Sequence, residues 1–229
     1  MVSFDQMDAR LKHLFTGVIA GPTGSGKTQF VKRLILADGN SLIEPAINNI
    51  IWCYGEYQDA YDHLASLVPQ IRFVEGYPDD LLQSFDRTRR NLVVIDDLMS
   101  ESGNNAKVTE LFTKGSHHRN LSVIFILQNL FYKAKEMRTI SLNAHYMVLF
   151  KNPRDASQIT HLARQMYPTK MKYMMEAYRD ATSTPYGYLL VDLKPIKSIN
   201  EEVESSRQSF EDVEACATQR SLPTRTGQG

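Results

Sequence analysis

The sequence predicts an α/β fold with a mostly parallel β-sheet that is covered by helices on both faces. Short apolar segments, typical of buried strands, alternate with segments of helical periodicity along most of the chain. One strand leads into a glycine-rich loop and a helix within residues 14–36, and another strand ends in two carboxylates, Asp96 and Asp97. The apolar runs are continuous rather than alternating, which indicates a sheet that is buried on both sides.

The first strand–loop–helix unit contains a phosphate-binding loop. Residues 14–20 form an apolar run, and residues 21–28, GPTGSGKT, match the pattern G-x-x-x-x-G-K-[ST]. Apolar residues at helical spacing follow directly. Backbone N–H groups of such a loop and of the helix N-terminus bind anionic oxygens, and glycines let the backbone approach them closely. The predicted nucleotide-binding residues are Gly21, Pro22, Thr23, Gly24, Ser25, Gly26, Lys27 and Thr28.

Lys27 and Thr28 carry the specific chemistry of this loop. The lysine places a positive charge against the β- and γ-phosphates of a nucleoside triphosphate, and the threonine hydroxyl can ligate Mg²⁺. A chance glycine-rich turn is the alternative interpretation. It is disfavoured because the motif lies between a strand and a helix, where this chemistry requires it. We therefore expect a nucleoside triphosphate and Mg²⁺ as ligands.

The remaining pattern extends the alternation of strands and helices. Further strands are expected at residues 50–54, 71–75, 91–98, 121–127, 145–150 and 186–193. Helices are expected at residues 56–67, 78–85, 106–114, 133–140, 153–166 and 170–180. We interpret the chain as an N-terminal lead-in at residues 1–13, a single domain at residues 14–199 and a flexible acidic tail at residues 200–229.

The composition is that of an ordinary globular chain. Hydrophobic residues make up 42% and charged residues 23%, and the formal net charge is zero. The chain therefore has no overall positive charge that would indicate nucleic-acid binding, so any DNA site must be a local patch. No apolar run is long enough to span a bilayer, and the N-terminus lacks the apolar core of a signal peptide. Cys53 and Cys216 lack metal-binding spacing, so we expect a reducing compartment.

The second chemical element ends the strand predicted at residues 91–98. A carboxylate at the C-terminal end of a buried strand can be the metal partner of a phosphate loop, so Asp96 is predicted to organise Mg²⁺. Asp97 is expected to point in a different direction and is the candidate general base for the attacking water. Two acids after an apolar strand can also merely cap a loop. The phosphate loop in the same domain favours the metal interpretation.

Two further polar residues flank the strand predicted at residues 121–127. Gln128 follows this strand and is expected at the ligand edge of the sheet, where its amide can bond the γ-phosphate or hold the water. The alternative is an amide that bonds a loop backbone. Arg119 precedes the strand at the opposite edge, which in a ring can face the nucleotide of a neighbouring subunit. The alternative for Arg119 is a solvated basic turn.

With these residues the chain resembles members of the FtsK–HerA superfamily of DNA-pumping ATPases. Within it, the chain is most similar over residues 14–193 to the small genome-packaging ATPases of double-stranded DNA viruses and of Polinton (Maverick) elements, virophages and adintoviruses. The resemblance is carried by GPTGSGKT, by Trp52, by VVIDDLM (93–99), by LFTKGSHHRNLSVIFILQNLF (111–131) and by NAHYMVLFKNPRDASQI (143–159).

The resemblance implies a RecA-like core, hydrolysis of ATP with Mg²⁺, a hexameric ring, and double-stranded DNA threaded into a preformed capsid. By position, residues 21–28 match the Walker A loop and Asp96 and Asp97 match the Walker B pair. Gln128 matches the sensor and Arg119 the candidate finger that acts in trans. The chain carries Asp-Asp where cellular members carry Asp-Glu. The implied partners are double-stranded DNA, further copies of the chain, and the capsid or its vertex protein. The implied location is the host cell, in the nucleus or a cytoplasmic viral factory, or the virion.

Two other functions stay open at this point. Nucleoside kinases also join a phosphate loop to an α/β sheet, although the sequence has no arginine-rich lid segment and such an enzyme does not require Gln128 with a preceding Arg119. A non-enzymatic switch would use nucleotide binding only to control assembly. DNA-stimulated ATP hydrolysis, phosphate transfer to nucleosides, and a ring without turnover are the observations that separate the three functions.

Overall fold

The computed structural model describes residues 10–36, 42–78, 80–98, 104–115, 120–130, 134–154 and 157–194. Its strands are β1 (Leu11–Lys12), β2 (Thr16–Ala20), β3 (Ile43–Glu44), β4 (Asn49–Tyr54), β5 (Ile71–Glu75), β6 (Asn91–Asp96), β7 (Leu121–Leu127), β8 (Tyr146–Phe150) and β9 (Tyr188–Asp192). Its α-helices are α1 (Lys27–Leu36), α2 (Ala60–Leu67), α3 (Asn104–Glu110), α5 (Ala134–Leu142), α6 (Ser157–Met166) and α7 (Met171–Ala181).

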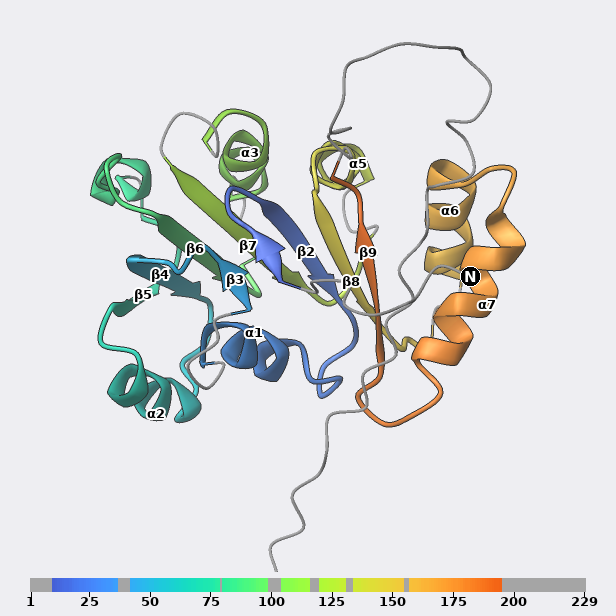
Figure 1. Cartoon of the computed structure of the whole chain (residues 1–229), viewed down its shortest axis with the longest axis horizontal. Helices are drawn as coiled ribbons and strands as arrows, with labels where there is room; N and C mark the ends of the chain where they lie inside the picture. The colour runs from blue at the N-terminus through green and yellow to red at the C-terminus, as the bar shows by residue number, and fades with distance from the viewer. Residues whose placement is uncertain are drawn as a thin grey trace, which may run out of the picture.

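Seven strands form one sheet in the order β5-β4-β6-β7-β2-β8-β9 (Figure 1). All neighbouring pairs are parallel except β8 and β9, which are antiparallel. β1 and β3 pair separately as a short parallel ribbon. The predicted α/β fold with a mostly parallel sheet is confirmed.

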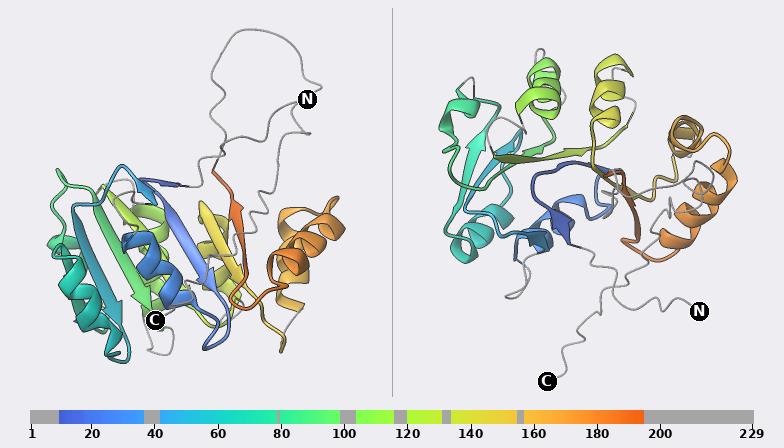
Figure 2. Two further views of the ribbon diagram at one scale, coloured as in Figure 1. Left: turned by 60° about the horizontal axis from the view of Figure 1, so that its bottom comes forward. Right: turned by 45° about the horizontal axis from the view of Figure 1, so that its top comes forward.

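The strands place alternate side chains on the two faces of the sheet, and each face has its own hydrophobic core. Val123, Phe125 and Leu127 of β7 pack in one core with side chains from α3, α5, α6 and α7. Ile124 and Ile126 pack in the other core with side chains from α1 and α2. Figure 2 shows helices on both sides of the sheet, as the continuous apolar strands predict.

Some predicted elements differ from those observed. The helix expected at residues 78–85 is wrong, because only the 3₁₀ turn Leu81–Ser84 forms and Phe85 is extended. One turn is enough to bury both Leu81 and Phe85 against the sheet. The helix expected at residues 106–114 begins earlier, as α3, and ends in the π-helical turn Leu111–Gly115.

Two details near the ends of the described chain also differ from expectation. Within the lead-in, Leu11 is buried and pairs with Ile43, so the described part of this segment belongs to the fold. The last strand begins at Tyr188 rather than at Tyr186, which lies in the preceding turn. The tail predicted at residues 200–229 lies outside the described residues. Within the described ranges, no helix is both long and apolar enough to cross a membrane.

Candidate nucleotide-binding site

The predicted site residues follow three adjacent strands of the sheet, β6, β7 and β2. The register pairs Asp96 with Ile126, and Ala20 with Leu127, so these parallel strands end at nearly the same level. The Gly21 N–H donates to the Leu127 carbonyl at 3.2 Å, which holds the start of the phosphate loop beside the end of β7. Segments that are distant in sequence therefore meet at the carboxyl edge of the sheet, where open α/β sheets bind ligands.

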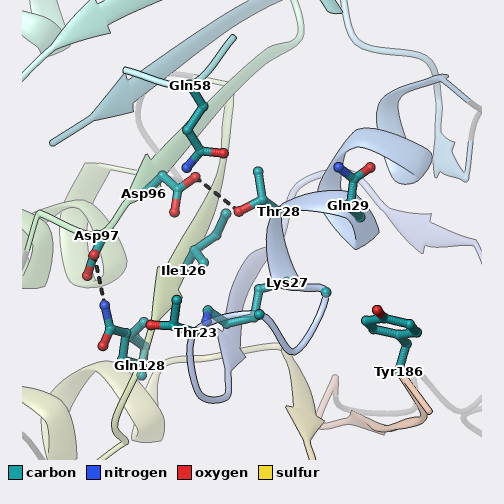
Figure 3. Close-up of a pocket in the computed structure, with 13 residues that line it drawn as sticks. Thr23, Lys27, Thr28, Gln29, Gln58, Asp96, Asp97, Ile126, Gln128 and Tyr186 are labelled. Carbon is teal, nitrogen blue, oxygen red and sulfur yellow. Dashed lines mark hydrogen bonds between the residues drawn. The ribbon is translucent and has the colours of Figure 1, made fainter. Parts of the chain in front are cut away.

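A pocket of about 440 Å³ lies at this edge. This volume is within the range that small-molecule sites usually have. Figure 3 shows the lining side chains that come from the phosphate loop, α1, the ends of β6 and β7, and two other loops. The lining residues are Thr23, Gly24, Gly26, Lys27, Thr28, Gln29, Gln58, Asp96, Asp97, Ile126, Leu127, Gln128 and Tyr186.

The phosphate loop requires glycine for two different reasons. Gly24 and Gly26 adopt φ values of 78° and 101°, in the left-handed region that other residues rarely adopt. Gly21 is limited by space instead, because a Cβ there would lie 2.6 Å from the Cβ of Phe150. The loop ends where α1 begins, at Lys27, so the free N–H groups of the first helical turn lie at the pocket.

The residues of this loop fit a bound triphosphate. The ammonium of Lys27 donates to the carbonyl oxygens of Gly21 at 2.7 Å and Pro22 at 2.9 Å, which keeps the cation against the loop. Burial lowers the pKa of Lys27, while the charges of Asp96 and Asp97 oppose this shift. The Ser25 Oγ is buried without a hydrogen-bond partner in the described part of the chain. A buried hydroxyl of this kind requires a partner, which a phosphate oxygen would provide.

Asp96 faces α1 and α2 because it has the same strand parity as Leu92 and Val94, which pack in that core. Its Oδ2 accepts hydrogen bonds from the Thr28 Oγ1 at 3.4 Å and from the Tyr61 hydroxyl at 3.3 Å. Burial raises the pKa of Asp96 to about 6, and the hydrogen bond from Tyr61 acts in the opposite direction. The carboxylate, which lines the pocket, is thus held by two hydroxyl groups.

The two predicted metal ligands, Thr28 and Asp96, therefore lie beside each other. The described residues contain no group of three or more His, Cys, Asp or Glu side chains that could hold a metal ion. One hydroxyl and one carboxylate suit Mg²⁺ in particular, because this ion usually retains waters and takes further ligands from substrate phosphates. The donor set fits a Mg²⁺–triphosphate complex.

Asp97 leaves the strand in a different direction from Asp96. Its φ of 54° is in the left-handed region, which aspartate tolerates better than most residues. Its Oδ2 accepts a hydrogen bond of 2.9 Å from the Gln128 Nε2 (Figure 3). The partner of the Gln128 side chain is therefore an acidic side chain at the pocket rather than a loop backbone. The pair joins the end of β6 to the end of β7.

Arg119 lies outside the described residues. Asn120, which is described, directly precedes β7 and therefore lies at the strand end opposite Gln128.

Several residues that contact Asp96 or line the pocket were not predicted as site residues from the sequence. Tyr61 falls in the helix expected at residues 56–67, and nothing in the local sequence indicates that its hydroxyl reaches Asp96. Tyr186 was expected in a strand, although Pro185 and Gly187 on either side of it are typical of a turn. The other unpredicted lining residues are Gln29, Gln58, Ile126 and Leu127.

No protein-family model and no curated protein matches the sequence. Among solved structures, B204, the DNA-packaging ATPase from Sulfolobus Turreted Icosahedral Virus, is similar with a TM-score of 0.54 and 14% identity, over 78% of this chain and 92% of that chain. The genome packaging NTPase B204 from Sulfolobus turreted icosahedral virus 2, in complex with ATP-gammaS, has a TM-score of 0.49 and 15% identity, over 78% and 92% of the two chains. The match with a TM-score of 0.54 shows that the fold is similar to that of B204, the DNA-packaging ATPase from Sulfolobus Turreted Icosahedral Virus.

Proposed function

We propose that the protein is an ATP-driven motor that moves double-stranded viral DNA into a preformed capsid. One observation carries this proposal. The phosphate loop, Asp96 and the Asp97–Gln128 pair meet at one edge of a sheet whose fold is similar to that of a DNA-packaging ATPase. The sequence motifs that resemble the genome-packaging ATPases supply independent support.

The phosphate loop and Lys27 would bind the triphosphate through backbone N–H groups and one ammonium group. Thr28 and Asp96 would hold Mg²⁺, which neutralises the charge that develops on the phosphate oxygens. Asp96 has a pKa of about 6, so it is largely ionised at pH 7 to 8 and able to act as a ligand.

Asp97 would act as the general base that accepts a proton from the attacking water. Its Oδ2 accepts the hydrogen bond from Gln128, and the carboxylate keeps further acceptor sites with which it could accept a hydrogen bond from the water. Gln128 would position this base, and it connects the base to β7 in the middle of the sheet. Breaking or making this hydrogen bond would transmit the state of the nucleotide to the rest of the protein.

The motor would work as a hexameric ring around DNA, with Arg119 acting on the nucleotide of the neighbouring subunit. A guanidinium group supplied in this way stabilises the charge of the transition state. The zero net charge is compatible with DNA binding, because each subunit needs only a few cations or amides in the channel. Contacts to phosphates alone bind DNA without regard to sequence, as packaging requires.

The test is ATP hydrolysis by the full chain with and without double-stranded DNA, combined with a mass measurement of the assembly. We expect DNA to stimulate hydrolysis in a species of ring size and Lys27→Ala to abolish it. Phosphate transfer to nucleosides without any effect of DNA would contradict the proposal in favour of a kinase. An assembled ring without turnover would contradict it in favour of a nucleotide-controlled switch.

A further inference from the structure

Tyr186 lies at one end of the pocket, and the Asp97–Gln128 pair lies at the other (Figure 3). The Tyr186 side chain is 72% exposed although it lines the pocket. It also lies close to the phosphate loop, because a Cβ added to Gly26 would lie 3.2 Å from the Tyr186 Cδ1. A large aromatic ring is therefore presented to the pocket directly beside the loop.

The backbone of Tyr186, which positions this ring, has an unusual conformation. Tyr186 has a φ of 60°, which a bulky residue rarely adopts. The turn that contains it is tight, because the Gly187 N–H donates to the Thr184 carbonyl at 3.1 Å, and a Cβ on Gly187 would lie 2.4 Å from the Ala181 carbonyl oxygen. Strained residues persist where the surroundings impose them, and they cluster at ligand sites.

The order of the side chains along the pocket indicates which part of a bound nucleotide would lie at this ring. Asp96, Asp97 and Gln128 mark the end at which a terminal phosphate would react. The phosphate loop lies between this end and Tyr186, and Gln29 is on the Tyr186 side of the loop (Figure 3). A triphosphate that extends along the loop from the acidic end therefore leaves its nucleoside at Tyr186.

We propose that Tyr186 is the base-binding platform of the site, on which the base of a nucleoside triphosphate stacks. This inference rests on the proposed function, since it requires a triphosphate in the phosphate loop. Every nucleobase has a π-face, so stacking favours ligands that carry a base over ligands that lack one. Tyr186 thus distinguishes a nucleotide from an inorganic polyphosphate that could occupy the same loop.

The experiment compares two probes, AMP-PNP and inorganic tripolyphosphate, each titrated with Mg²⁺ into the full chain by calorimetry. Tyr186→Ala should weaken AMP-PNP binding by about 5- to 100-fold, the range expected for loss of base stacking. It should leave the affinity for tripolyphosphate within about twofold, because the phosphate contacts remain. Tyr186→Phe keeps the ring and should bind AMP-PNP like the wild type. Tyr173→Ala is the matched control, because Tyr173 is 54% exposed on α7 and does not line the pocket.

Three results would overturn the inference in distinguishable ways. Unchanged AMP-PNP affinity in Tyr186→Ala would refute the base platform and leave the nucleotide site standing. An equal loss of affinity for both probes would show that Tyr186 supports the phosphate loop and does not bind the base. A wild-type chain that binds neither probe would refute the proposed nucleotide site itself, and the platform with it.

Discussion

The hydroxyl of Tyr61 donates a 3.3 Å hydrogen bond to Oδ2 of Asp96 in the interior of the protein. Because Thr28 donates to the same oxygen, α1, α2 and β6 all meet at this carboxylate. Tyr61 is itself fixed by stacking on Phe73, with 4.7 Å between the ring centroids. The predicted metal ligand is therefore positioned by a helix that contributes nothing to the phosphate motif.

Asp96→Asn should change the stability of the protein in a pH-dependent way when Mg²⁺ and nucleotide are absent. Folding raises the pKa of Asp96 from 3.8 to about 6, so the folded state binds this proton more tightly than the unfolded state. Wild-type stability should therefore fall relative to Asp96→Asn as the pH rises through this interval, by about 2 to 3 kcal/mol in total. Urea unfolding at pH 4 and pH 8 measures the difference. A constant difference between the two proteins would contradict the buried, proton-binding carboxyl group.

Tyr61→Phe should raise the pKa of Asp96 further, because the lost hydrogen bond favours the charged carboxylate. Mg²⁺ binding requires the ionised form, so the pH at which Mg²⁺ begins to strengthen AMP-PNP binding should move upward. Calorimetric titrations across pH 5 to 8 test this shift. A pH profile identical to that of the wild type would show that the Tyr61 hydroxyl does not influence the metal ligand.

Lys27→Ala should weaken ATP binding by about 10- to 100-fold, the usual effect of losing a charge-assisted hydrogen bond. It should also abolish turnover, since no other group of the loop supplies a positive charge. The fold should survive, because within the described part of the chain the Lys27 ammonium donates hydrogen bonds to two loop carbonyls and not to a buried acidic side chain. Equilibrium binding and steady-state hydrolysis measure these effects. Normal turnover would refute the site.

Asp97→Asn should retain ATP binding but slow hydrolysis by about 100- to 10,000-fold, the range for a missing general base. The asparagine oxygen can still accept the hydrogen bond from Gln128, so the substitution removes the charge and keeps the pair. Single-turnover kinetics at saturating ATP isolate the chemical step. Loss of binding with an unchanged chemical step would place Asp97 among the metal ligands instead.

Arg119→Ala should be inactive alone and should regain part of its activity when mixed with Asp97→Asn subunits. A mixed interface can join an intact arginine to an intact catalytic pocket, which neither variant offers by itself. ATP hydrolysis measured across mixing ratios tests this expectation. A strictly additive, inactive mixture of assembled rings would show that Arg119 does not act in trans.

Much of the arrangement of the candidate site could be predicted from the sequence because its motifs are local. The pattern in residues 21–28 places glycines where the backbone needs positive φ, as Gly24 and Gly26 show. Parallel strands end at the same edge, so Asp96 and Gln128 could be expected near the loop before the strand order was known. The helix expected at residues 78–85 was wrong because apolar spacing alone does not distinguish one buried turn from a helix.

The sequence by itself determined the alternation of strands and helices, the phosphate loop and the two acids at a strand end. Only the tertiary structure decided the strand order β5-β4-β6-β7-β2-β8-β9 and the contacts that depend on it. The Tyr61 and Thr28 hydroxyls reach Asp96 across 35 and 68 residues of sequence. Tyr186 similarly reaches Gly26 from the far end of the fold. Periodicity records which face of an element is buried, but not which element packs against that face, so these partners follow only from the packing of the whole chain.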